Sequence, residues 1–369
     1  MSYNTHGTSY SFTTIDVPDP LMRPRNTFAT GINDHGTVVG ASVRVPFPIG
    51  GAYTGFIDEK GTLSTITTNS TSSLALTLGS AKLDINDSGT LVGTGGDGRT
   101  ITHRAFVDEK GAVTTINVTG ALVSEAKSIN ASGTVVGFYQ DAGVVPGSAF
   151  GKHGFIYENG STTSFDAPNS NSTVASGINA QGIIVGTYHD ADTPPDSPVG
   201  IHGFVDANGV FTTVDVPGAD STSASGVNAG GAIVGSYTDK QGTHGFVDKN
   251  GCFTTIDVPG ASGTSIDDIN ARGMLVGSYT DSQGTHGFVA SPEGGAIADA
   301  SRSLIDLLRS QITNITLRDL VPSIDMTTNP SAHSFRSPEP VDVTDTGLGG
   351  FSIAVPTDAW TVAVPTNGG

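Results

Sequence analysis

Six related segments follow one another along the chain, and this internal repetition limits the fold more than any other feature. A phenylalanine marks the same point of each segment. It stands at Phe56, Phe106, Phe155, Phe204, Phe246 and Phe288, which gives periods of 50, 49, 49, 42 and 42 residues. Periods of this length are typical of the blades of a β-propeller. One repeat domain with an appended segment is therefore a simpler interpretation of the 369 residues than several average domains.

Each segment predicts four short antiparallel strands joined by tight turns. In the fifth segment, strands are expected at residues 223–228, 232–238 and 243–248 and from Phe253 onward. The first hairpin turn is Asn-x-x-Gly and the second resembles Asn250-Gly251, and both supply the positive φ that tight hairpins need. The first-turn asparagine recurs at Asn33, Asn86, Asn130, Asn179, Asn228 and Asn270. Six recurrences indicate a role in the turn rather than in catalysis.

The two ends of the repeat region predict how the propeller closes. The chain opens with a fourth-strand sequence, residues 12–18, before any first strand, and the sixth segment stops after its third strand at residues 286–289. We therefore predict an all-β fold over residues 9–295. It is a six-bladed β-propeller of four-stranded blades, closed by the N-terminal strand joining the last blade. Such closure leaves no open sheet edge at the seam.

The chain after Gly295 departs from the repeat, so residues 296–369 are expected to form a C-terminal helix and an extended tail. Apolar residues at helical spacing between Ala300 and Ile312 predict the helix, and Pro322 ends it. The tail is rich in Pro and Gly. Its apolar runs at 351–355 and 360–364 fit either a strand pair or a C-terminal export signal.

Two predictions concern packing inside the blades. The second strand contains an Ile/Val-Val-Gly run that should be buried on both faces, with its glycine allowing neighbouring sheets to approach closely. This glycine stands at Gly40, Gly93, Gly137, Gly186, Gly235 and Gly277. Cys252, the only cysteine, is expected to be a small buried group. A single cysteine also excludes an intramolecular disulfide and a thiolate metal cluster.

The charge of the chain excludes several partners. A net charge of −18 and a pI near 4.6, without any Lys/Arg cluster, argue against nucleic acid. No apolar run approaches the length of a membrane span, so membrane insertion is not expected. The first residues show no signal peptide. We expect a monomer.

The repeat resembles that of the HAF-family extracellular repeat proteins of bacteria. Their unit runs Gly-Ile-Asn-x-x-Gly-x-Ile-Val-Gly-x-Tyr-x-Asp, then His-Gly-Phe, then Thr-Thr-Ile-Asp-Val-Pro-Gly-Ala. Residues 177–190 with 202–219, 226–239 with 244–261, and 269–288 match it closely, and the resemblance covers about residues 10–290. Unit two departs most, with His103-Arg104-Ala105-Phe106, and Asp-Val-Pro does not follow Thr65-Ile66. The resemblance implies an extracellular or cell-surface protein and brings no catalytic residues.

Loop lengths indicate where a ligand would bind. Connections between second and third strands are short in units five and six but carry insertions at residues 41–53, 140–152 and 189–201. Because function commonly lies where a rigid scaffold displays variable loops, this long-loop face is the predicted binding face. The insertions of units three and four are the predicted ligand rim.

Recurrent polar residues near that face are the candidate site residues. For ligand binding they are His153, His202, His244, His286, Tyr188, Tyr237 and Tyr279, and for a metal they are Asp141, Asp190, Asp239 and Asp281. Acidic loops of oxygen ligands make Ca²⁺ the candidate cofactor. A histidine repeated in every blade fits a repeated structural bond as well as acid–base or metal chemistry.

Three functions remain open from the sequence. The first is a binding module, secreted or displayed on a surface, that recognises a glycan or protein ligand. The second is a propeller hydrolase, with or without a metal, whose Asp and His groups converge near the central channel. The third is a structural exoprotein. The absence of Gly-x-Ser-x-Gly, His-Glu-x-x-His and phosphate-loop motifs favours a non-catalytic role, and no catalytic residue is assigned.

Overall fold

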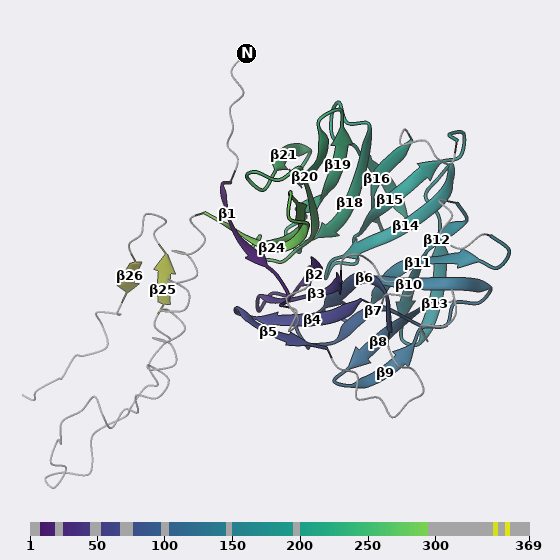
Figure 1. The fold of residues 1–369 in the computed structure, drawn as a ribbon, viewed down its shortest axis with the longest axis horizontal. Coiled ribbons are helices and arrows are strands. Elements are labelled where there is room, and N and C mark those ends of the chain that lie inside the picture. Colours follow the sequence, from purple (N-terminus) through teal and green to yellow (C-terminus); the bar gives the residue numbers. More distant parts are fainter. Residues whose placement is uncertain are drawn as a thin grey trace, which may run out of the picture. The chain divides into compact units, whose positions relative to one another are not determined.

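The computed structural model describes residues 8–18, 25–44, 53–66, 77–96, 103–144, 150–194 and 200–293, and two strands near the C-terminus. Six four-stranded antiparallel sheets are arranged around a common centre (Figure 1). This confirms the predicted six-bladed β-propeller. Within the described residues the chain contains no helix, and so none that is long and apolar enough to cross a membrane.

Each blade runs in chain order from its innermost to its outermost strand. Blade 1 holds β2 (Arg25–Ile32), β3 (Thr37–Arg44), β4 (Thr54–Glu59) and β5 (Thr62–Thr65). Blade 2 holds β6 (Thr77–Ile85), β7 (Leu91–Gly96), β8 (Arg104–Glu109) and β9 (Ala112–Thr115). Blade 3 holds β10 (Ala121–Ile129), β11 (Val135–Asp141), β12 (Lys152–Glu158) and β13 (Ser161–Phe165).

The second half of the propeller follows the same plan. Blade 4 holds β14 (Ser170–Ile178), β15 (Ile184–Asp190), β16 (Ile201–Ala207) and β17 (Val210–Val214). Blade 5 holds β18 (Ser221–Val227), β19 (Ile233–Asp239), β20 (Gly242–Lys249) and β21 (Cys252–Ile256). Blade 6 holds β22 (Gly263–Ile269), β23 (Leu275–Thr280) and β24 (Thr285–Pro292), with β1 (Tyr10–Ile15) as its outermost strand.

The N-terminal strand closes the propeller as predicted. β1 pairs antiparallel with β24, in a register that runs from Tyr10 opposite Pro292 to Ile15 opposite Gly287. Ile15 and Val17 are buried in a cluster with residues of blade 1. The first and last strands of the repeat region therefore belong to one sheet.

The phenylalanine and the glycine of each repeat form one packing unit inside a blade. Gly40 of β3 lies opposite Phe56 of β4, and the other five blades repeat this pair. A Cβ on Gly40 would collide with the carbonyl oxygen of Phe28 and lie 2.8 Å from the Phe56 ring. The second strands are buried as predicted, but the glycine makes room for the phenylalanine ring of the neighbouring strand in its own sheet. The predicted role in sheet-to-sheet approach is wrong at this position.

The predicted burial of Cys252 is also wrong. Its side chain is exposed at the start of β21, the outermost strand of blade 5. Successive side chains of a strand point to opposite faces, and one face of an outermost strand is exposed to solvent; Cys252 lies on that face. The aromatic neighbour Phe253 takes the packed side instead.

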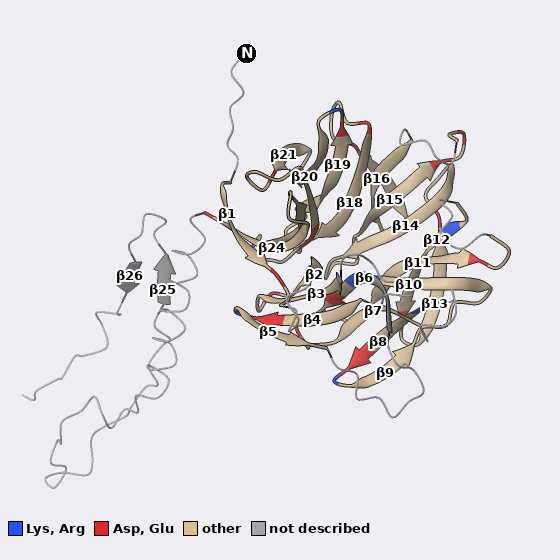
Figure 2. Cartoon of the chain, viewed as in Figure 1, with Lys and Arg blue, Asp and Glu red and all other residues tan. Residues whose placement is uncertain are grey.

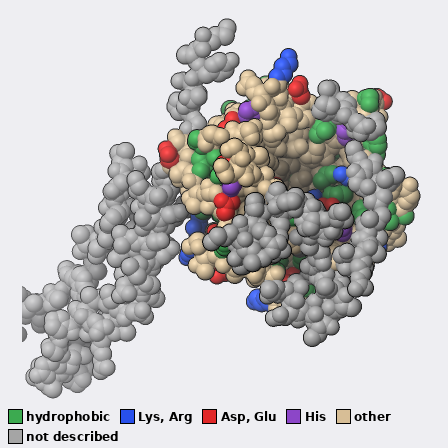
Figure 3. Space-filling view, viewed as in Figure 1, with side chains coloured by type: hydrophobic (Ala, Val, Ile, Leu, Met, Phe, Trp, Pro, Cys, Tyr) green, Lys and Arg blue, Asp and Glu red, His purple; other side chains and the backbone are tan. Residues whose placement is uncertain are grey.

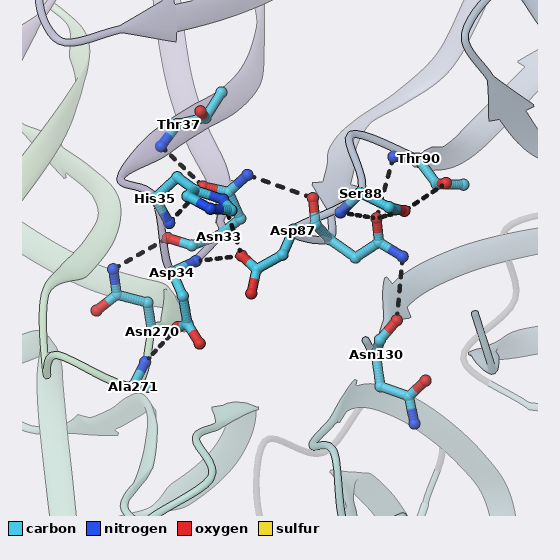
Figure 4. Close-up of polar contacts among 11 residues, drawn as sticks. Asn33, Asp34, His35, Thr37, Asp87, Ser88, Thr90, Asn130, Asn270 and Ala271 are labelled. Atoms are coloured by element: carbon cyan, nitrogen blue, oxygen red, sulfur yellow. Dashed lines mark hydrogen bonds and ion pairs between the residues drawn. The ribbon is translucent and has the colours of Figure 1, made fainter. Parts of the chain in front are cut away.

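The recurrent asparagines join all six blades through one continuous set of hydrogen bonds, which we call the asparagine ring. Each side-chain amide donates to the backbone carbonyl of the asparagine in the next blade, over 3.0–3.3 Å, and Asn270 donates to Asn33 to complete the circle. Figure 4 shows part of it, around Asn33, Asn130 and Asn270. The side-chain oxygen of each asparagine accepts from backbone N–H groups of its own turn. One residue type thus forms the turn and connects neighbouring blades.

Replacing Asn130 should be costly for this reason. Asn130→Ala removes the bond to the Asn179 carbonyl and the acceptor of the Ser132 and Thr134 amides, and Asn130 is 6% exposed. Unpaired buried groups cost about 1–3 kcal/mol each, so we expect a loss of about 2–4 kcal/mol in unfolding free energy. Urea unfolding measures this, with the exposed Asn117→Ala as control. Equal stability of the two variants would contradict a structural role for the ring.

The chain divides into two compact units, residues 1–301 and 302–369. In the second unit, β25 (Asp342–Asp345) pairs antiparallel with β26 (Phe351–Ala354). The run at 351–355 thus forms most of a strand, paired with residues upstream of it. The predicted helix and the run at 360–364 lie outside the described residues.

Candidate functional site

Blades 3 to 6 carry the same polar unit, built from a histidine of the third strand and two aspartates. The histidine Nδ1 lies 2.8–2.9 Å from an aspartate that follows the fourth strand: Asp166, Asp215, Asp257 and, from the N-terminal strand, Asp16. Its Nε2 lies 3.2–3.4 Å from an aspartate at or just beyond the end of the second strand: Asp141, Asp190, Asp239 and Asp281. We call each set a histidine clamp.

A tyrosine supports each clamp. The rings of Tyr139, Tyr188, Tyr237 and Tyr279 lie against the clamp histidines, with centroids 5.1–5.3 Å apart. The hydroxyl groups of the last three are 2.9–3.1 Å from a threonine hydroxyl of the outermost strand of the same blade. The predicted histidines, tyrosines and aspartates therefore meet within blades. The structure does not bring the four histidines together, and Figure 3 shows histidine side chains dispersed over the visible face.

The clamps of His244 and His286 favour a protonated imidazole. The hydrogen bond that His244 donates to Asp257 raises the pKa of His244. Burial acts to lower the pKa of His286, but the hydrogen bond to Asp16 and the charge of Asp16 have the larger combined effect, so this pKa is raised as well. The Gln241 amide holds the pKa of Asp239 below its usual value. A protonated imidazole offers no lone pair to a metal. Within the described ranges, no three His, Cys, Asp or Glu side chains are grouped to hold an ion.

His244→Ala should therefore change stability in a pH-dependent way. A raised folded-state pKa stabilises the folded protein below the unfolded value of about 6.5, and this stabilisation is lost as pH rises through the raised value. The melting temperatures of wild type and variant should differ most between about pH 5 and 6.5 and converge at higher pH. The exposed His35→Ala is the control. A difference that grows with pH would contradict a protonated clamp.

The insertions of blades 3 and 4, the predicted ligand rim, meet at one place. The Gly151 amide donates to the Asn171 carbonyl of β14, so the end of the blade 3 insertion runs along blade 4. The Asn171 side chain donates to the Asp190 carbonyl, where the blade 4 insertion begins. The Phe150 ring lies edge-on to the His189 ring, with centroids 6.0 Å apart. We call Phe150, Gly151, Lys152, Asn171 and His189 the blade 3–4 junction.

Two acceptors at the junction are buried without a hydrogen bond. His189 is 6% exposed, and its Nδ1 lies 3.1 Å from the Asp190 carbonyl oxygen. Its Nε2 has no partner, nor has the buried side-chain oxygen of Asn171. Unpaired buried polar atoms are rare, and each calls for a physical explanation.

The third polar group of the junction is an unpaired cation. Lys127 forms an ion pair of 2.8 Å with Glu125, but Lys152 has no ion-pair partner within the described residues. Both ammonium groups lie 5.1–5.2 Å from the centroid of the Phe138 ring. Burial, together with the charge of Lys127, lowers the pKa of Lys152 in spite of Glu125. The whole chain has seven lysines and a net charge of −18, so two lysines beside one aromatic ring are an exception to its acidic character.

A second cluster lies on the innermost strands. Asp84 accepts from the Ile85 and Ile129 amides, and Asp268 accepts from those of Ile269 and Ile32, so each carboxyl bonds to its own blade and the next. Burial and then the charge of Asp84 raise the pKa of Asp268 to about 8. Lys82 donates to the carbonyls of Thr30 and Asp267, over 2.7 and 3.2 Å.

Sequence reasoning named the aspartates near Nε2 but missed those at Nδ1, which are Asp16, Asp166, Asp215 and Asp257, and it assigned no role to the inner carboxyls. In blades 3 to 5 the second clamp aspartate follows the histidine by 13 residues, a constant spacing inside the repeat. Asp84 and Asp268 stand two residues before the ring asparagine, where other blades carry Gly or Ser. Figure 2 shows acidic residues mostly at strand ends around the propeller rather than in one region.

Comparisons with known proteins find propeller structures of low similarity and no family. No known protein family matches the sequence, and no curated protein matches it. Among solved structures, the propeller domain of the Trilobed protease from Pyrococcus furiosus is 8% identical with a TM-score of 0.44, and the match covers 73% of this chain and 96% of that one. A sialidase from Trypanosoma rangeli is 8% identical with a TM-score of 0.44, over 84% and 63% of the two chains.

A fungal lectin from Aleuria aurantia, described as a six-bladed β-propeller with a fucose recognition mode, is 9% identical with a TM-score of 0.41. That match covers 71% of this chain and 90% of the lectin. This chain spans less than two thirds of the length of the sialidase. At identities and TM-scores this low, the similarities carry no argument about function.

Proposed function

We propose that this protein is a secreted or surface-displayed propeller that binds a glycan or protein ligand through its long-loop face. The observation that carries the proposal is the blade 3–4 junction. There the sixfold repetition is broken by two insertions in contact, and buried polar groups lack partners. In the clamps, by contrast, most of the polar atoms have partners within the clamp itself. The location outside the cell rests on the acidic, lysine-poor composition and on the resemblance to HAF repeats.

A propeller hydrolase is the second candidate, and the inner carboxyls favour it. Burial and the charge of Asp84 raise the pKa of Asp268 to about 8. Carboxyls with shifted pKa values are candidate acid–base groups. Each oxygen, however, already accepts a backbone N–H group, which fits a structural connection between blades equally well.

A loop exchange tests the binding face. The variant replaces residues 191–200 with the Lys240-Gln241-Gly242 connection of blade 5, which joins the same two strands by a short route. Wild type should bind a member of a glycan or extracellular-protein panel, and the variant should lose that binding while unfolding at a similar temperature. Measurements in Ca²⁺ and in EDTA show whether the predicted Ca²⁺ at Asp141, Asp190, Asp239 or Asp281 takes part.

Two outcomes would contradict the proposal. Undiminished binding by the loop-exchange variant would place the ligand elsewhere. Hydrolysis of a panel member that Asp84→Ser abolishes, without stable binding, would favour the hydrolase. Lys249→Thr, an exposed change in the hairpin between third and fourth strands of blade 5, is the control on the opposite face.

A further inference from the structure

We propose that the blade 3–4 junction binds an anionic saccharide, whose carboxylate or sulfate pairs with Lys152 and whose hydroxyl groups donate to His189 and Asn171. The inference rests on the proposed function and names its ligand class and its residues. Three features of the junction carry it: two unpaired acceptors, an unpaired cation and an aromatic ring beside them.

The two acceptors lie close together because both side chains bond to one oxygen. Asn171 Nδ2 donates to the Asp190 carbonyl over 2.9 Å, and His189 Nδ1 lies 3.1 Å from the same atom. A neutral imidazole that donates from Nδ1 presents a lone pair at Nε2. The free atoms, His189 Nε2 and Asn171 Oδ1, therefore both require donors. Sugar hydroxyl groups are donors small enough to reach such atoms.

Lys152 supplies the charge. It follows Gly151, whose amide donates to the Asn171 carbonyl, so its backbone is one residue from the strand that carries one of the two acceptors, and its ammonium group lies over the Phe138 ring. Lys127 beside it forms an ion pair with Glu125, whereas Lys152 forms none with any described residue, although the charge of Glu125 also acts on it. An anionic group on the ligand would provide the missing charge partner. The neighbouring ammonium of Lys127 makes such an anion more favourable still.

Phe150 places an aromatic ring beside the acceptors. Its ring lies edge-on to the ring of His189, which is 6% exposed, so a hydroxyl group that reaches Nε2 requires a local rearrangement of the side chains around it. An aromatic ring at this place can lie against the apolar face of a sugar. The arrangement suits a small polyhydroxylated unit better than a peptide, because a peptide brings one backbone donor per residue.

The repeat itself supplies mild variants for the test. Blades 5 and 6 carry Thr238 and Thr280 at the position of His189, and Thr243 and Thr285 at that of Lys152. His189→Thr and Lys152→Thr thus introduce residues that the same sheet position already accommodates. Lys152→Arg keeps the charge. Lys249→Thr and His35→Thr are matched controls at exposed positions on the opposite face.

The experiment is calorimetric titration of the full chain with three saccharide probes: neutral oligohexoses, oligogalacturonates and sulfated oligosaccharides. Wild type should bind one or both anionic probes, more weakly as the salt concentration rises, and it should bind the neutral probe least.

Losing one charge-assisted contact costs about tenfold in affinity, so Lys152→Thr should bind the anionic probe about tenfold more weakly, and Lys152→Arg should keep most of the wild-type affinity. His189→Thr should weaken it by a similar factor, and both controls should match wild type. If the oligogalacturonate binds more tightly, the preferred anion is a carboxylate. If the sulfated oligosaccharide binds more tightly, it is a sulfate.

Failure of this inference is distinguishable from failure of the proposed function. Anionic saccharide binding that survives both threonine substitutions, yet is lost on loop exchange, would overturn the junction residues and leave the face intact. Equal affinity for neutral and anionic probes would overturn the role of Lys152. Binding to an acidic peptide and to none of the saccharides would overturn the ligand class while supporting a binding module.

Discussion

A chain that lacks residues 1–18 should lose its cooperative unfolding transition. The deletion removes β1, so β24 becomes an open edge, and it removes the buried side chains of Ile15 and Val17. Burial of such side chains contributes about 1.5–3 kcal/mol each, and each ladder hydrogen bond about 0.5–1.5 kcal/mol. The sum approaches the total stability of about 5–15 kcal/mol that folded domains have. Calorimetry and gel filtration of the truncated chain measure the effect.

The matched control is deletion of residues 1–7, which leaves β1 in place. This shorter deletion should keep the wild-type transition. Addition of a synthetic peptide of residues 8–18 to the longer deletion should restore a cooperative transition, because the peptide can occupy the free edge. A truncated chain that melts within a few degrees of wild type would show that blade 6 does not need its fourth strand.

Stability should fall as pH rises from about 4 to 8, and the inner carboxyls should account for much of the slope. The pKa of Asp268 is about 8 in the folded protein, because of burial and then of the charge of Asp84, while Lys82 acts in the opposite direction. In the unfolded chain an aspartate titrates near 3.9. The folded state therefore binds more protons over this range, and each pH unit removes about 1.4 kcal/mol for this one group. Urea unfolding at pH 5, 7 and 9 measures the slope.

Asp84→Ser separates this effect from the clamps of His244 and His286, whose contribution to stability is also lost as pH rises. Serine occupies the same position in blade 3, at Ser128, and it removes the charge that raises the pKa of Asp268. The variant should be less stable than wild type at pH 5, because the Ile85 and Ile129 amides lose acceptors, and its slope should be shallower. The exposed Glu109→Ser should keep the wild-type slope. A wild-type stability that is level or rises from pH 5 to 8 would contradict the shifted carboxyl.

The blade architecture could be predicted because its determinants are local and repeated. The turn asparagine and the strand phenylalanine recur in every blade, and the displaced fourth-strand sequence at residues 12–18 showed how the propeller closes. The exposure of Cys252 could not be predicted in this way, because the two faces of an outermost strand look alike in a short run of residues.

The candidate site was predictable only as a region. The insertions of blades 3 and 4 stood out by length, but they lack the repetition that would have aligned His189 with Asn171. Their meeting depends on backbone bonds between blades, such as Gly151 to Asn171, which no spacing in the sequence reveals. The inner carboxyls were hidden for the opposite reason, because Asp84 and Asp268 replace small residues inside an otherwise regular pattern.

The asparagine ring makes this repeat protein different from an open array. In an open array the terminal repeats have one neighbour each, and they can fray while the centre stays folded. Here every blade gives one side-chain bond to the next and receives one from the previous, and Asn270 returns to Asn33. No blade is terminal, so there is no weakest place from which unfolding can begin one repeat at a time. Lengthening or shortening such a protein by a blade would break the circle, whereas loops on its faces can change freely.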